Sequence, residues 1–210
     1  MNEKQKNIKI VFIGDEGVGK TSIIMRIEQG IFQENLNSTV GMANRQTILK
    51  FNNKDPIKIS NIDIGGREKN DFTLKYAIKD ASAIVLVSCV NNSGFSSEDL
   101  KANWLNAIKN YAPQDVILAL VLNKSDLLIE NKEYNKDSLK KVADEINAMY
   151  YITSALKNEG ITELYEGLIR KIKGWNTNVK FVIKEKKENE IEIEKIQKNK
   201  KIFRDWNCCY

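Results

Sequence analysis

The segment 14–21, Gly-Asp-Glu-Gly-Val-Gly-Lys-Thr, constrains the fold more than any other part of the chain. It fits the phosphate-binding loop pattern, in which a glycine and four further residues precede Gly-Lys-Thr. The apolar run 8–13 before it is typical of a buried strand, and the pattern from 19 to 29 predicts a helix. Glycines let backbone N–H groups converge on an anion, and the helix N-terminus adds its positive end. The segment therefore predicts a nucleotide phosphate site, with Lys20 reaching the β- and γ-phosphates and the Thr21 hydroxyl on Mg²⁺.

Strand and helix patterns alternate along the chain, which predicts an α/β fold. Strands are expected at 8–13, 45–51, 57–62, 83–90, 116–122 and 150–153, and helices at 19–29, 71–80, 97–111, 136–149 and 161–172. The turn residues 52–56 predict a hairpin between the second and third strands. We expect a mainly parallel six-stranded sheet with one antiparallel edge strand and helices on both faces.

Composition bounds the class of protein and its domains. The 210 residues are 42% hydrophobic, and no apolar run approaches the roughly 18 residues of a membrane span. Residues 1–6 contain no apolar stretch of a secretory signal, so a cytoplasmic protein is expected. The absence of histidine excludes His acid–base chemistry, and the net charge of +5 does not indicate a nucleic-acid partner. Residues 1–176 are expected to form one domain, and 177–210, with nine Lys or Arg against six Asp or Glu, a flexible tail.

A second motif, Asn-Lys-Ser-Asp at 123–126, follows the strand pattern at 116–122. A carboxylate at Asp126 could accept hydrogen bonds from N1–H and the 2-amino group of guanine, a donor pair that adenine lacks. The alternative is a polar turn that caps a helix. Residues 153–155, Thr-Ser-Ala, would bring backbone N–H groups near the guanine O6. The spacing of the two motifs favours guanine recognition.

In order and spacing, residues 8–173 resemble the small GTPases of the Ras superfamily, which implies the P-loop GTPase fold, GTP or GDP as ligand and Mg²⁺ as cofactor. The resemblance implies that Phe32 packs on the base, and that Thr21, Thr39 and Asp63 hold the metal. It assigns catalysis to Lys20, Thr39, Gly66 and the residue at the usual glutamine position, Arg67. The implied nucleotide-binding residues are Gly14, Asp15, Glu16, Gly17, Val18, Gly19, Lys20, Thr21, Ser22, Phe32, Thr39, Gly66, Asn123, Lys124, Asp126, Ser154, Ala155 and Leu156.

The Rab branch is the most similar. The segment 100–111, with Leu100, Leu105 and Ile108 on one helical stripe, looks like the Rab helix with its central tryptophan, here Trp104. The terminal Cys208 and Cys209 look like the cysteines on which Rab proteins carry geranylgeranyl groups, and a CaaX box is excluded because Asn207 stands fourth from the end. The resemblance implies a monomer on the cytosolic face of an intracellular membrane. Its implied partners are an exchange factor, a GTPase-activating protein, a prenyl transferase escort and effectors.

The chain also departs from this pattern. Small GTPases usually have glutamine after Asp-x-x-Gly, whereas Arg67 stands here, and arginine has no acceptor with which to position water. Rab proteins usually have a small residue in place of Glu16, whose carboxylate would repel the γ-phosphate. We therefore expect slow hydrolysis. The two charges could pair, both could face solvent, or Arg67 could act on the phosphate as a built-in arginine finger.

Three further departures concern an aromatic patch that binds Rab partners. Asn44, Ile62 and Ala77 stand at the positions of those aromatics.

The leading interpretation is a switch in vesicle-mediated transport. The alternatives are a hydrolysis-deficient GTP-bound scaffold at a membrane and, against the guanine motif, a P-loop ATPase or nucleoside kinase.

Overall fold

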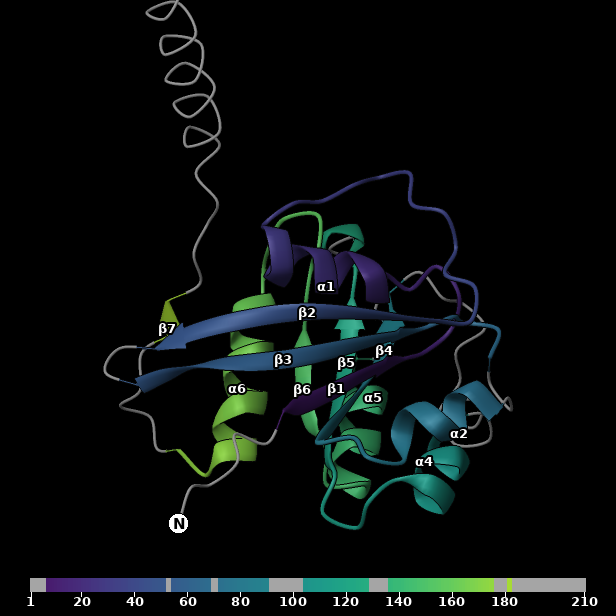
Figure 1. The fold of residues 1–210 in the computed structure, drawn as a ribbon. Helices are drawn as coiled ribbons and strands as arrows, with labels where there is room; N and C mark the ends of the chain where they lie inside the picture. Colours follow the sequence, from purple (N-terminus) through teal and green to yellow (C-terminus); the bar gives the residue numbers. More distant parts are fainter. Residues whose placement is uncertain are drawn as a thin grey trace, which may run out of the picture.

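The structure is a computed structural model that describes residues 7–51, 54–68, 72–90, 104–128, 136–175 and 181–182. Its described strands form one sheet in the order β6-β5-β4-β1-β3-β2-β7 (Figure 1). The strands are β1 Ile8–Ile13, β2 Met42–Phe51, β3 Lys54–Ile64, β4 Ala83–Cys89, β5 Ile117–Asn123, β6 Met149–Ile152 and β7 Phe181–Val182. Strand β1 pairs in parallel with β3 and β4, and β5 and β6 continue the parallel part. The mainly parallel α/β sheet is thus confirmed.

The described sheet contains one short strand in addition to the six that were predicted. Strand β2 is antiparallel to β3 as expected, but its end at Lys50 and Phe51 is covered by β7, which pairs with those two residues. The two residues of β7 give no periodic signal, because two positions are too few to show an alternation of side chains. Both β2 and β3 are also longer than predicted, since their ladder runs from Met42 opposite Ile64 to Phe51 opposite Lys54.

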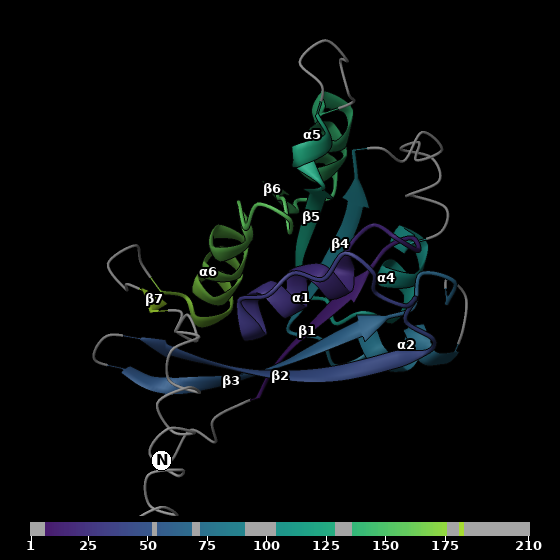
Figure 2. The ribbon, with the colours of Figure 1, turned by 90° about the horizontal axis from the view of Figure 1, so that it is seen from above.

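Helices cover both faces of the sheet (Figures 1 and 2). They are α1 Lys20–Gln29, α2 Phe72–Ile78, α4 Asn106–Tyr111, α5 Lys136–Glu145 and α6 Ile161–Lys173. Helix α5 ends earlier than predicted, because Asn147 has a left-handed φ of 53° that breaks the helical ladder. The predicted helix over 97–111 is described only from Trp104 onward, and Leu100 lies outside the described residues.

Alternation along the strands divides the core into two layers. Ile10 and Phe12 of β1 pack with α1 and α6, whereas Val11 and Ile13 pack with α2, α4 and α5. Strands buried on both faces are continuous apolar runs, which is why their positions could be predicted. The carboxyl ends of β1, β3, β5 and β6 meet at one edge of the sheet, where an α/β protein binds its ligand.

Candidate nucleotide-binding site

The loop after β1 is built so that only glycine fits at its bends. Gly14, Gly17 and Gly19 have φ angles of 136°, 76° and 96°, a region that L side chains rarely adopt. A Cβ on Gly14 would lie 2.1 Å from the carbonyl oxygen of Val87, and one on Gly19 would lie 2.3 Å from Nδ2 of Asn123. The loop is therefore packed tightly against the ends of β4 and β5.

The ammonium group of Lys20 folds back over this loop. Its Nζ donates hydrogen bonds of 2.8 Å to the carbonyl oxygens of Gly14 and of Asp15. The side chain is buried, and burial lowers the pKa of Lys20, while the negative charge of Asp63 is the largest opposing influence. A charged donor held at this point is placed to meet an anion in the loop.

Two hydroxyl groups and one carboxylate converge beside Lys20. Oγ1 of Thr21 donates to Oδ2 of Asp63 at 2.6 Å, Oγ1 of Thr39 donates to the same oxygen at 3.0 Å, and the two hydroxyl oxygens are 3.1 Å apart. The other oxygen of Asp63, Oδ1, is buried and has no hydrogen-bond partner in the described part of the chain. Magnesium takes hard oxygen ligands and keeps several waters, so this donor set fits the expected cofactor.

The residues after β5 and β6 are joined to the phosphate loop and to one another. Asn123 donates from Nδ2 to the carbonyl oxygen of Val18 at 2.9 Å and accepts from Oγ1 of Thr153 at 2.9 Å. Oγ of Ser154 donates to Oδ1 of Asp126, which fixes the orientation of that carboxylate. The guanine motif is thereby held at a defined distance from the phosphate loop.

A cavity of about 370 Å³ runs between these segments. The expected nucleotide-binding residues that line it are Glu16, Gly17, Gly19, Lys20, Thr21, Ser22, Phe32, Thr39, Gly66, Asn123, Lys124, Asp126, Ala155 and Leu156. Gly14, Asp15, Val18 and Ser154 are not in the lining, and the bonds above show them supporting it. Residues 33–34 and 36–38 complete the wall without having been predicted.

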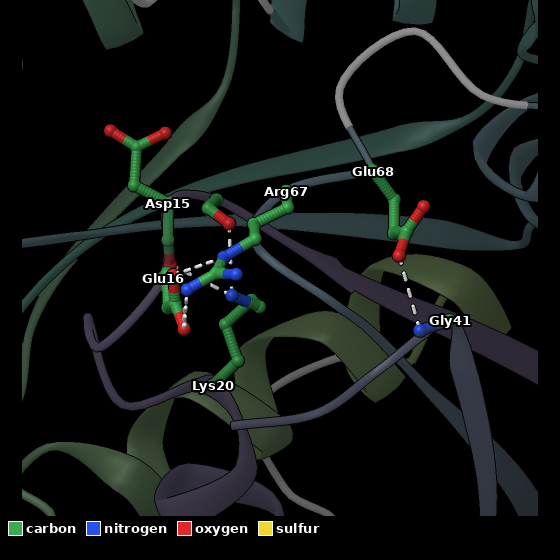
Figure 3. A network of polar contacts seen from close by, with 7 residues as sticks. Asp15, Glu16, Lys20, Gly41, Arg67 and Glu68 are labelled. Atoms are coloured by element: carbon green, nitrogen blue, oxygen red, sulfur yellow. Dashed lines mark hydrogen bonds and ion pairs between the residues drawn. The ribbon is translucent and has the colours of Figure 1, made fainter.

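Arg67 and Glu16 form a two-point ion pair at the mouth of the loop (Figure 3). Nε of Arg67 donates to Oε2 of Glu16 at 2.7 Å, and Nη2 donates to Oε1 at 3.2 Å. The hydrogen bond from Arg67, followed by one from Ser38, lowers the pKa of Glu16, and Glu16 raises the pKa of Arg67. Of the arrangements left open by the sequence, the structure shows the pairing, and the two side chains do not face solvent unpaired.

The backbone beside this pair closes on the phosphate loop. A Cβ on Gly66 would lie 2.1 Å from the amide nitrogen of Glu16, so the two main chains are in direct contact. Gly41 then joins the neighbouring loops, since its carbonyl accepts from Gly65 N at 2.8 Å and its N–H donates to Glu68 Oε1 at 3.2 Å (Figure 3). The phosphate loop, the segment before β2 and the segment after β3 thus form one contact network.

Comparison with known proteins decides the family. Residues 9–174 match the model of the Ras family. The chain belongs to the Ras family. The Ras-related protein Rab-5B of Plasmodium falciparum is 32% identical over 171 residues, covering 81% of this chain and 80% of that protein. The human Ras-related protein Rab-22A is 30% identical over 83% of this chain and 88% of its own length. The GTP-binding protein ypt5 of Schizosaccharomyces pombe is 26% identical over 79% of this chain and 78% of its own length.

The protein is therefore a Rab-like small GTPase of vesicle trafficking, which agrees with the function predicted from its motifs. Members of the Ras family bind GTP or GDP with Mg²⁺ and hydrolyse GTP. Among the residues that the structure describes, no helix is long and apolar enough to cross a membrane.

Two contacts of this Rab-like GTPase were not predicted from its sequence. Trp104, which lies just before α4, donates from Nε1 to Oδ1 of Asp15 at 3.3 Å and so links this segment to the phosphate loop. Arg26 of α1 donates to the carbonyls of Ala155 and Leu156. An arginine interrupting the apolar residues of α1 was the available signal, but its partners lie about 130 positions away, so spacing could not reveal them.

Proposed function

We propose that this Rab-like GTPase is a slowly hydrolysing switch, and the pair between Arg67 and Glu16 is the observation that carries the proposal. Arginine stands where the family uses a glutamine to orient the attacking water. Its guanidinium has donors only, and two of them are engaged by the carboxylate of Glu16. The guanidinium of Arg67 can therefore accept no hydrogen bond from water, and its engagement by Glu16 opposes its use as an arginine finger.

The carboxylate of Glu16 adds a second obstacle. Glu16 lines the cavity together with Lys20, which is expected to reach the γ-phosphate, and with Gly66, to which the resemblance assigns a part in catalysis. Its lowered pKa means that it is charged at neutral pH, and a negative group at this position repels the developing charge of the transferring phosphoryl group. Both effects oppose hydrolysis without removing the groups that bind the nucleotide.

The remaining residues support binding and residual catalysis. Lys20 and the backbone N–H groups of the loop would hold the phosphates, and Thr21, Thr39 and Asp63 would hold Mg²⁺ through their oxygens. When bound, the metal neutralises phosphate charge. Because these groups are retained, hydrolysis is expected to be slowed and not abolished, and a permanently GTP-bound scaffold is not favoured for a member of this family.

Single-turnover hydrolysis tests this proposal. Purified protein loaded with GTP and Mg²⁺ should release phosphate at least about tenfold more slowly than an ordinary Rab protein measured beside it, because water positioning is worth a factor of this order or more. An activating protein that supplies its own glutamine should restore turnover. A rate equal to that of the reference Rab protein would contradict the proposal, and a slow rate that no such activator raises would favour the scaffold.

We further propose that Cys208 and Cys209, which lie outside the described residues, carry prenyl groups. Two lipid chains supply the two signals that stable membrane anchoring requires, and the excess of Lys in the tail adds attraction to anionic lipid. Membrane attachment would place the switch, acting as a monomer, on a cytosolic membrane face. Mass spectrometry of the C-terminal peptide from native protein should show both additions, and an unmodified peptide would contradict the assignment.

The exposed side chains of this protein favour binding partners that differ from those of ordinary Rab proteins. Of the three positions that carry partner-binding aromatics in Rab proteins, Ile62 and Ala77 are buried here, and Asn44 is exposed but polar. Exposed aromatic area lies instead on α2, where Phe72 and Tyr76 are 77% and 61% exposed. An exchange factor, a GTPase-activating protein and effectors remain the partner classes that the family implies.

A further inference from the structure

Arg26 connects the end of α1 to the loop after β6, which lies about 130 positions away in the sequence. Its Nε donates to the carbonyl oxygen of Ala155 at 2.7 Å, and its Nη2 donates to that of Leu156 at 2.9 Å. Its Nη1 donates to the carbonyl oxygen of Gly30, at the end of α1, at 2.8 Å. All three nitrogens of the guanidinium are thus engaged by backbone carbonyls.

The same guanidinium also faces the ring of Phe32. The central carbon of Arg26 lies 5.6 Å from the centre of that ring, within the range of a cation–π contact. Phe32 lines the cavity and packs against the core below it. The side chain of Arg26 therefore touches both walls between which a guanine base would lie.

Arg26 itself does not line the cavity, whereas its partners Phe32, Ala155 and Leu156 do. Arg26 can therefore affect a bound base only through these partners. A planar guanidinium sets two neighbouring carbonyls at a fixed spacing, which a lysine ammonium cannot do. Fixing the carbonyls of Ala155 and Leu156 fixes the two peptide planes to which they belong, and it restrains the preceding peptide unit, which carries the N–H of Ala155.

We propose that Arg26 is a positioning residue for guanine nucleotides, which holds the loop 154–156 and the ring of Phe32 in the arrangement that receives the base. This inference rests on the assignment of Ala155 and Phe32 to the base, and it is independent of the slow hydrolysis proposed above. Loss of Arg26 leaves the phosphate loop and the Mg²⁺ ligands intact. It lets the nucleotide leave faster and weakens selection for the 6-oxygen of guanine.

Dissociation of GDP with a fluorescent label on the ribose gives the first test. Arg26→Ala should raise the dissociation rate about tenfold, because charge-assisted hydrogen bonds are lost. Arg26→Lys, which keeps the charge but not the fork, should raise it about threefold. Arg45→Ala is the matched control, since Arg45 also contacts α1, through Glu28 at 3.6 Å, but does not touch the base loop. Its rate should equal that of the unsubstituted protein.

A base analogue separates positioning from a general loosening of the fold. The diphosphate of 2-aminopurine riboside lacks the 6-oxygen that the N–H of Ala155 would bind. Arg26→Ala should weaken GDP about tenfold and the analogue less than about threefold. Equal losses for both ligands, or a GDP dissociation rate within twofold of the unsubstituted protein, would overturn the inference. If the unsubstituted protein failed to bind GDP, the assigned function itself would be at fault.

Discussion

Replacing Asp126 by asparagine should lower the affinity for GDP and GTP about a thousandfold and create affinity for xanthosine nucleotides. The carboxylate presents two acceptors to the two N–H donors of guanine, whereas an amide presents one acceptor and one donor. The donor would then face the 2-amino group, and a site built for a hydrogen bond rejects a base that cannot make it. Xanthine has a 2-oxygen at that place and would accept from the amide.

The hydrogen bonds around Asp126 allow this substitution to test base recognition specifically. Asp126 is oriented by the hydroxyl of Ser154, whose oxygen also accepts from the N–H of Lys157, so the side chain is held without burial of a second charge. Competition of GDP, XDP and ADP against labelled nucleotide measures the change. Asp144→Asn on the exposed side of α5 is the control and should change none of the three affinities. Unaltered GDP affinity in Asp126→Asn would remove Asp126 from the base site.

Replacing Lys20 by alanine should lower GTP affinity by a similar factor, for a different reason. A charge pair at about 4 Å in a partly screened site is worth about 4 kcal/mol, or about a thousandfold in Kd. The substitution also leaves the carbonyls of Gly14 and Asp15 without their buried donor. Titration with labelled GTP measures the loss, and Lys171→Ala on the exposed face of α6 should show none. A loss below about tenfold would mean that Lys20 only braces the loop.

The lowered pKa of Lys20 adds a pH dependence with a definite sign. Burial lowers the pKa in the protein without ligand, and bound phosphate charge would raise it again. Between those two pKa values, binding takes up a proton, so GTP affinity should fall as the pH rises. The fall should begin below pH 10.5, the ordinary value for lysine, and should be missing in Lys20→Ala.

The parts of this molecule that sequence could predict are those with a local physical cause. Three features constrain the structure around them: the apolar run of β1, the glycines of the phosphate loop and the charge of Lys20. The strand, the loop and the helix after it could therefore be predicted from the sequence. The pair of Glu16 and Arg67 could be suggested because both positions approach the same phosphate. A strand of two residues, such as β7 on β2, is too short to leave a side-chain pattern. The bonds from Arg26 to Ala155 and Leu156 depend on tertiary folding and gave no spacing signal.

The central claim is that Arg67 and Glu16 each hold back hydrolysis, and four proteins measured together test it. Single-turnover phosphate release is compared among the unsubstituted chain, Glu16→Ala, Arg67→Gln and the double variant, at equal GTP and Mg²⁺ occupancy. Glu16→Ala alone should gain only a few-fold, because the repelling carboxylate is removed but Arg67 still cannot position water. Arg67→Gln alone should also gain only a few-fold, because the carboxylate remains. The double variant should be faster than the unsubstituted chain by about tenfold to a hundredfold. A double variant within twofold of the unsubstituted rate would contradict the account.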